Sequence, residues 1–153
     1  MSFGSILNAT DISASGLAAE RLRMEVAANN IANAYSTRSV EGGAYRRQQV
    51  VFAEALGEAR RAGGARQRGE LVGGLQGVRV VGVESDQSPL PTVFDPGHPD
   101  ADENGLVQMP NVKLPHEMVD LMTASRAYEA NLKSLQTFRQ MAEQALSVLQ
   151  GIG

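Results

Sequence analysis

Residues 115–150 read PHEMVDLMTASRAYEANLKSLQTFRQMAEQALSVLQ, with no Gly and with no Pro after Pro115. Positions along this stretch follow one another at alternating spacings of three and four, and most are apolar: Met118, Leu121, Ser125, Tyr128, Leu132, Leu135, Arg139, Ala142, Leu146 and Leu149. This heptad pattern is typical of a helix that packs one stripe of side chains against a partner helix. Pro115 suits the first helical turn, and Gly151 is a common stop. We therefore predict a long helix within a C-terminal segment, residues 115–153.

The N-terminal segment, residues 1–34, shows a similar but less regular pattern. Between residues 3 and 34 it has no Pro and a single Gly, Gly16. Apolar or small side chains recur at spacings near three and four: Ile6, Ala9, Ser13, Leu17, Met24, Ala28 and Ile31. At about 1.5 Å per residue, the two helices would be roughly 48 Å and 54 Å long. These similar lengths predict that the two ends of the chain pair as an antiparallel coiled coil.

The middle segment, residues 35–114, has a different composition and favours short strands and loops. The best strand candidates are residues 49–52 and 78–83, which are rich in Val. Residues 57–77, rich in Gly and Arg, are typical of a mobile loop or long hairpin, and residues 94–99 of a turn. The predicted fold is therefore α+β, with long terminal helices and a small β-rich, loop-rich middle.

The two predicted helices carry more apolar surface than their pairing would cover. A second apolar row runs beside each first row, as at Ile12, Ala19, Leu22 and Val26. Because uncovered apolar faces mark interaction surfaces, we expect other subunits to complete the packing and the termini of the isolated molecule to be disordered. The alternative is a core shared with the middle segment. The side chains expected to pack on assembly are Leu17, Met24, Ile31, Met118, Leu121, Tyr128, Leu132, Leu135 and Leu146.

A cluster of asparagines lies near the end of the N-terminal helix, at Asn29, Asn30 and Asn33. Asparagine tolerates the left-handed backbone and caps helix carbonyls, so the cluster is consistent with a helix C-terminus. The alternative is an interface, because a buried polar residue can fix the register between two helices. Asn30 and Asn33 share a face of the helix.

Composition excludes several classes of function. The formal net charge is −3, which disfavours nucleic-acid binding by the whole domain. There is no Cys, so disulfides and cysteine-ligated metals are excluded. No apolar run approaches the roughly 20 residues of a membrane helix, and we expect neither membrane insertion nor a cleaved signal peptide. A basic block over residues 38–79 precedes an acidic block over 84–120; the blocks attract each other within one fold or between subunits.

Three motifs contain residue types that can take part in chemistry. Residues 100–105 match the first half of a calcium loop, but the twelfth position is Asn111 where Glu is required, so an acidic turn is favoured. His98 and His116 lie in a predicted turn and at a predicted helix start, which favours solvated side chains over acid-base catalysis. The arginines over residues 60–68 are favoured as a solvated loop over an anion-binding one. We therefore predict no enzyme activity, cofactor, metal or small-molecule substrate.

Several motifs resemble the rod–hook–filament axial family of the bacterial flagellum. Residues 28–34 (ANNIANA) resemble its N-terminal signature, and residues 42–47 (GGAYRR) the segment that follows. Residues 95–102, 109–112 and 114–131 are similar to the proximal-rod members in particular. The resemblance runs in order over roughly residues 5–150. Leu106 stands where the family often has an aromatic residue.

The resemblance implies a structural subunit of the basal-body rod. Its terminal helices would form the inner layer of a tubular drive shaft that transmits torque and encloses the export channel. Its partners would be copies of itself, other rod proteins and the adaptor at the rod base near the export gate. The subunit would leave the cell through the flagellar type III apparatus for the periplasm-spanning basal body. The alternatives are another axial subunit, of rod or hook type, and a generic helical adaptor.

Overall fold

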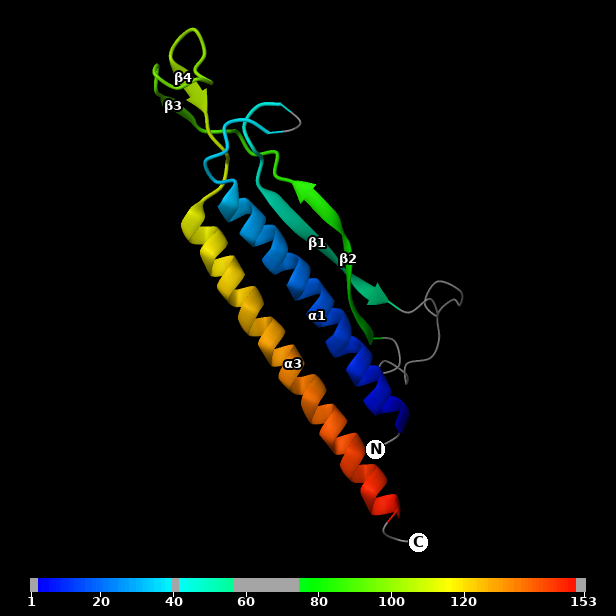
Figure 1. The fold of residues 1–153 in the computed structure, drawn as a ribbon. Coiled ribbons are helices and arrows are strands. Elements are labelled where there is room, and N and C mark those ends of the chain that lie inside the picture. The colour runs from blue at the N-terminus through cyan, green and yellow to red at the C-terminus, as the bar shows by residue number, and fades with distance from the viewer. Residues whose placement is uncertain (1–2, 40–41, 57–74, 151–153) are drawn as a thin grey trace, which may run out of the picture. The chain divides into compact units, whose positions relative to one another are not determined.

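A computed structural model describes residues 3–39, 42–56 and 75–150, with side chains over 9–39, 42–53 and 77–148. Along the chain the elements are α1 (Phe3–Ala32), β1 (Gln48–Leu56), β2 (Leu75–Ser85), β3 (Thr92–Phe94), β4 (Leu106–Gln108) and α3 (Leu114–Gln150) (Figure 1). A long helix at each end and a small β middle confirm the α+β class.

The two helices agree closely with the sequence pattern. α1 ends at Ala32, after which Asn33 N donates to the carbonyl of Asn29 at 3.0 Å. α3 begins at Leu114, and Pro115 lies in its first turn. Neither helix has the length and apolar character needed to cross a membrane.

The strands form two separate sheets. β1 pairs with β2, and their arrows point in opposite directions in Figure 1. Both strand candidates, residues 49–52 and 78–83, lie within these strands. The predicted loop over 57–77 overlaps β2 from Leu75 onward, whereas residues 57–74 lie outside the described part of the chain.

β3 and β4 form a short antiparallel hairpin that the sequence pattern did not predict. Its register pairs Thr92 with Gln108, Val93 with Val107 and Phe94 with Leu106. The turn predicted over residues 94–99 begins at the end of β3. Three-residue strands are too short to show an alternating pattern.

The chain divides into two compact units, which are described separately. The first unit comprises residues 1–21, 52–81 and 125–153, and the second comprises 22–51 and 82–124. Each long helix contributes residues to both units. Buried apolar residues in the second unit are small: Val26, Ala27, Ala34, Ala44, Val107 and Ala124.

In the first unit, α1 and β2 approach closely at Ser15 and Gly77. Ser15 Oγ donates to the carbonyl of Ile12 at 2.7 Å and accepts from Val78 N at 3.2 Å. Gly77 has a φ of 85°, and a Cβ at this position would lie 2.1 Å from Ser15 Oγ. Only glycine fits this conformation and this contact without strain.

We expect Gly77→Ala to destabilise the first unit by more than about 1 kcal/mol, because alanine is strained at positive φ and its methyl group would displace Ser15. Gly82→Ala is the matched control in the same strand, since a Cβ there meets nothing within 4 Å. Urea unfolding followed by circular dichroism measures both. Equal stability of the two variants would contradict the close contact.

Candidate functional site

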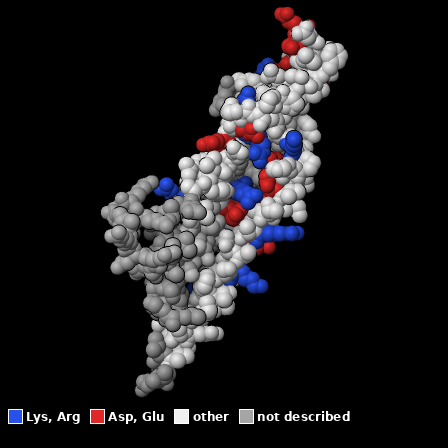
Figure 2. Space-filling model, turned by 180° about the vertical axis from the view of Figure 1, so that it is seen from behind, with Lys and Arg blue, Asp and Glu red and all other residues white. Residues whose placement is uncertain are grey.

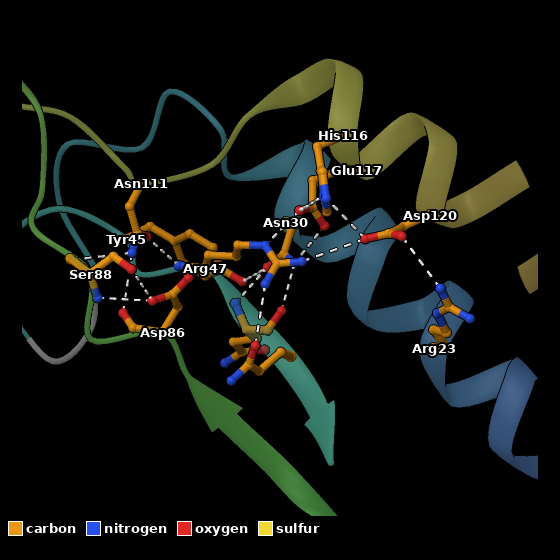
Figure 3. A network of polar contacts seen from close by, with 12 residues as sticks. Arg23, Asn30, Tyr45, Arg47, Asp86, Ser88, Asn111, His116, Glu117 and Asp120 are labelled. Carbon is orange, nitrogen blue, oxygen red and sulfur yellow. Dashed lines mark hydrogen bonds and ion pairs between the residues drawn. The ribbon is translucent and has the colours of Figure 1, made fainter. Parts of the chain in front are cut away.

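Asn30, in the last turn of α1, lies at the centre of a buried polar network in the second unit and is 1% exposed. Its Nδ2 donates to the carbonyl of Gln48 and to Glu117 Oε2, both at 2.8 Å (Figure 3). Its Oδ1 accepts from Gln48 N and from the Tyr45 hydroxyl, both at 2.9 Å. The carboxamide therefore pairs with both backbone groups of the first residue of β1, and all four of its hydrogen-bonding positions are used.

Glu117, in the first turn of α3, is also 1% exposed. Besides the bond from Asn30, its Oε1 accepts from Arg47 Nε at 2.7 Å. A buried carboxylate is costly unless it is paired and hydrogen-bonded, and here each oxygen has a donor. The N-terminal end of the helix dipole adds a favourable field for this negative charge.

Arg47 continues the network toward the surface. Its Nη2 lies 3.5 Å from Asp120 Oδ2, and Asp120 Oδ1 lies 3.3 Å from a guanidinium nitrogen of Arg23. His116 Nδ1 lies 3.3 Å from Asp120 Oδ2, although the His116 side chain is 65% exposed. Alternating charges thus connect α1, the segment before β1 and the first two turns of α3 (Figure 3).

Asn111 ties the segment after β2 to the start of β1. Its Oδ1 accepts from Arg47 N at 2.7 Å, and its Nδ2 donates to the carbonyls of Asp86 and Ser88 at 3.2 and 3.4 Å. Arg46 Nη1 donates to the same two carbonyls. Hydrogen bonds from the hydroxyl and backbone N–H of Ser88 lower the pKa of Asp86. We name the set of Asn30, Tyr45, Arg47, Asn111, Glu117 and Asp120 the polar junction.

Tyr45 is the member of the polar junction whose ionisation is most clearly perturbed. Burial raises its pKa above the ordinary value of 10.0, and the negative charge of Glu117 raises the pKa further. The hydroxyl therefore stays protonated and donates to Asn30 over the physiological range.

The junction contains residue types that can bind a metal ion, but the guanidinium of Arg47 already lies among them. Ligand atoms of His116, Glu117 and Asp120 lie within 4.8 Å of one another, the one such group in the described part of the chain. Arg47 contacts both carboxylates. A metal ion would have to displace this guanidinium, so the arrangement favours an ion-pair network over a metal site.

The calcium-like segment is likewise explained by internal contacts. Asp100 accepts from Thr37 Oγ1 at 2.8 Å and pairs with Arg38. Asp102 Oδ1 accepts from the backbone N–H groups of Asn104 and Leu106, each at 2.8 Å. These carboxylates therefore stabilise the loop between β3 and β4 and its attachment to the segment after α1.

The structure places the predicted residues in different settings. Asn30 is buried in the junction, whereas Asn33 donates locally to Asn29, at its carbonyl and Oδ1. Half-buried packing candidates are Leu17, Met24, Ile31, Leu121, Tyr128 and Leu135. Exposed candidates are Asn29, Met118, Leu132 and Leu146. The arginines at 60–68 lie outside the described residues.

Sequence reasoning did not single out five of the six members of the junction. Tyr45 and Arg47 lie in one segment that follows α1, whereas Asn111, Glu117 and Asp120 lie much further along the chain. Each lies in a segment that carried the family resemblance, namely residues 42–47, 109–112 and 114–131. The motifs that carry the family resemblance were therefore the usable signal, because residues from three of them meet at the junction.

Comparisons with known proteins show the family to which the chain belongs. The family "Flagella basal body rod protein" matches residues 11–37, and "Flagellar basal body rod FlgEFG protein C-terminal" matches residues 103–148. A FlgC protein of Borreliella burgdorferi is 41% identical over 95% of this chain and 99% of its own. The chain belongs to the FlgC family of flagellar basal-body rod proteins.

Other FlgC proteins show the same extent of similarity. That of Salmonella typhimurium is 41% identical over 94% of this chain and 97% of its own. That of Bacillus subtilis is 36% identical over 90% of this chain and 94% of its own. FlgC proteins are structural rod proteins and not enzymes, which confirms the predicted class of function.

Replacing Asn30 with alanine should destabilise the second unit by roughly 2–4 kcal/mol, because Glu117 and both backbone groups of Gln48 would lose buried partners. Asn33→Ala is the matched control and should cost less than about 1 kcal/mol, since the Asn33 amide bonds to the nearby residues Asn29 and Ser36 at the exposed end of the helix. Urea unfolding compares the two variants. A smaller loss for Asn30→Ala than for Asn33→Ala would contradict the central place of Asn30.

The raised pKa of Tyr45 predicts a pH dependence of stability at high pH. Below about pH 10 Tyr45 is protonated in both states, so its contribution is fully present. As pH rises through the folded-state pKa, this contribution is lost, because the unfolded chain releases the proton first. Tyr45→Phe should therefore lose less stability above pH 10 than the wild type, as measured by urea unfolding.

Tyr35→Phe is the control for this experiment, since the Tyr35 side chain is 73% exposed. That variant should keep the wild-type slope of stability against pH. Identical slopes for Tyr45→Phe and the wild type would show that Tyr45 is not held protonated by the junction.

Proposed function

We propose that this FlgC-family chain is a proximal-rod subunit whose terminal helices pair antiparallel as a coiled coil and pack against neighbouring subunits in the wall of a tube. The tube transmits torque and encloses the export channel. The observation that carries this proposal is the buried bond between Asn30 and Glu117, which joins the two ends of the chain.

The positions of contacts within each unit support antiparallel pairing. In the second unit, Asn30 contacts Glu117 and Arg23 contacts Asp120. In the first unit, a Cβ at Gly16 would lie 2.9 Å from Asn131 Nδ2. As residue numbers fall along α1, the numbers of the partners rise along α3, which is the order expected for antiparallel helices.

Exposed apolar side chains on α3 support packing between subunits. They are Met118, Val119, Met122, Leu132, Met141, Leu146 and Val148. Apolar surface of this kind is typical of interfaces. A head-to-tail contact that does not close into a ring generates a helical assembly, and many such weak contacts together make a stiff tube.

Asn30 and Asn33 contribute to this assembly by fixing the register of α1 along α3. Asn30 is buried against Glu117, so sliding α1 along α3 would leave buried polar groups without partners. Asn33, by capping the end of α1, sets where the helix stops. The packing side chains Leu17, Met24, Ile31, Leu121, Tyr128 and Leu135 then meet fixed positions on neighbouring helices.

The partners are copies of this chain, other rod proteins and the adaptor at the rod base near the export gate. The subunit reaches the periplasm-spanning basal body through the flagellar type III apparatus, without a cleaved signal peptide. Family membership supports this placement. Imaging basal bodies of a deletion strain tests it: rings should remain in the membrane while the rod is absent, whereas an intact rod would exclude the proposal.

Leu132→Asp should abolish motility while export of the subunit remains measurable, because a carboxylate on the packing face would be desolvated on assembly. The Leu132 side chain is 38% exposed in the single chain, so the variant should fold. Swimming in soft agar and the amount of subunit outside the cytoplasm are the measurements.

Ser134→Asp provides the matched control, since it places the same carboxylate on an exposed position of the same helix. This variant should swim. Normal swimming by Leu132→Asp would refute a packing role for this face of α3.

A further inference from the structure

The β3–β4 hairpin presents an aromatic side chain to solvent. Phe94 pairs across the strands with Leu106, and the two are 70% and 37% exposed. Val107, on the opposite face, is 2% exposed. Val107 is therefore the buried residue of the hairpin, although Val93 on the same face is 50% exposed. Phe94 is directed into solvent, and Leu106 is partly exposed at a cavity that Thr37 and Ala44 also line.

One edge of the Phe94 ring lies close to the backbone of the hairpin at Gly105. Gly105 has a φ of 75°, and a Cβ at this position would lie 3.1 Å from Phe94 Cε2 and 3.0 Å from Pro96 Cβ. The absence of a side chain lets the ring lie against the backbone at Gly105. A ring that is fixed before binding loses little conformational entropy when it is bound.

The surroundings of this ring are acidic. Asp95, Asp102 and Glu103 are exposed, and acidic residues gather at the hairpin end of the second unit in Figure 2. Among the described residues these three carboxylates have no ion-pair partner, in contrast to Asp100, which pairs with Arg38. We name Phe94 and Leu106, with Asp95 and Glu103 beside them, the acidic knob.

A cavity of complementary character lies elsewhere in the second unit. It has a volume of about 480 Å³, and prolines together with Val112 form its apolar wall: Pro89, Pro91 and Pro110. Lys113 and His116 also line it, and Lys113 is exposed with no ion-pair partner in the described part of the chain. Its two carboxylates are already engaged, Glu117 by Arg47 and Asp86 by hydrogen bonds from Ser88. We name it the proline-lined cavity.

The cavity is large enough for an aromatic side chain. A cavity of about 150 Å³ in another protein accepts benzene, and a proline-lined wall offers the flat apolar surface on which a ring packs. Phe94 is not among the lining residues, so the chain does not fill the cavity with its own ring. A phenyl ring flanked by carboxylates meets both the apolar wall and the cation Lys113.

We propose that the acidic knob of one copy of this chain inserts Phe94 into the proline-lined cavity of a second copy, with Asp95 facing Lys113. The contact joins two different surfaces, so in a pair one copy keeps a free cavity and the other keeps a free knob, and the arrangement extends head to tail. This inference rests on the proposed rod function and names one lateral contact by which copies of the subunit would associate.

Single-cysteine variants test the contact cleanly, because the natural chain has no Cys. Purified full-length Asp95→Cys and Lys113→Cys chains, with different tags, are mixed and treated with a short bis-maleimide cross-linker. We expect heterodimer yield to exceed that of the control pair Val93→Cys with Lys113→Cys by on the order of tenfold, because Val93 lies on the other face of the hairpin.

Adding Phe94→Ala to the Asp95→Cys chain should lower the yield to that of the control pair, since a buried aromatic anchor dominates such contacts. Equal yields for the test and control pairs, or no effect of Phe94→Ala, would overturn the proposal. The rod function would stand in that case if Leu132→Asp still abolished motility, so the two failures are distinguishable.

Discussion

The second unit depends on the side chain of Asn30, which makes hydrogen bonds that the backbone of a neighbouring strand could make. The carboxamide of Asn30 bonds to both the N–H and the carbonyl of Gln48, which is what a neighbouring strand would do. The same group bonds to Glu117 on α3. Because these bonds are buried, any displacement of α1, β1 or α3 would leave polar groups without partners. One residue thus sets the positions of three elements.

Such a polar arrangement suits a unit with little apolar core. The buried apolar side chains of the second unit are Ala and Val, and the larger apolar side chains of α3 are exposed or half-buried. Hydrophobic burial within one chain therefore contributes modestly to the stability of this unit. Its buried ion pair contributes more to fixing the positions of the elements than to stability. The apolar surface that a single chain leaves exposed is available for the packing between subunits that we propose.

The sequence predicted the long helices because their periodicity extends over many turns, and it located β1 and β2 through their Val-rich runs. It missed β3 and β4, whose three residues each carry no pattern. It selected Asn30 but not Glu117, since a pairing over 87 residues leaves no trace in local spacing. The heptad stripe contains Met118, which is 55% exposed, whereas the adjacent Glu117 is 1% exposed. The ion pair of Glu117 determines which side of the first turn of α3 is buried. A pattern of apolar residues carries no information about such a pair.

The separation between Asn30 and Glu117 also governs when the molecule can fold. Contacts between distant parts of a chain form late, because the intervening loop must close first. A chain that is synthesised from its N-terminus holds α1 without its acidic partner until residue 117 has been added. The N-terminal helix then remains unanchored during synthesis, and the complete fold forms only after the last helix has been made.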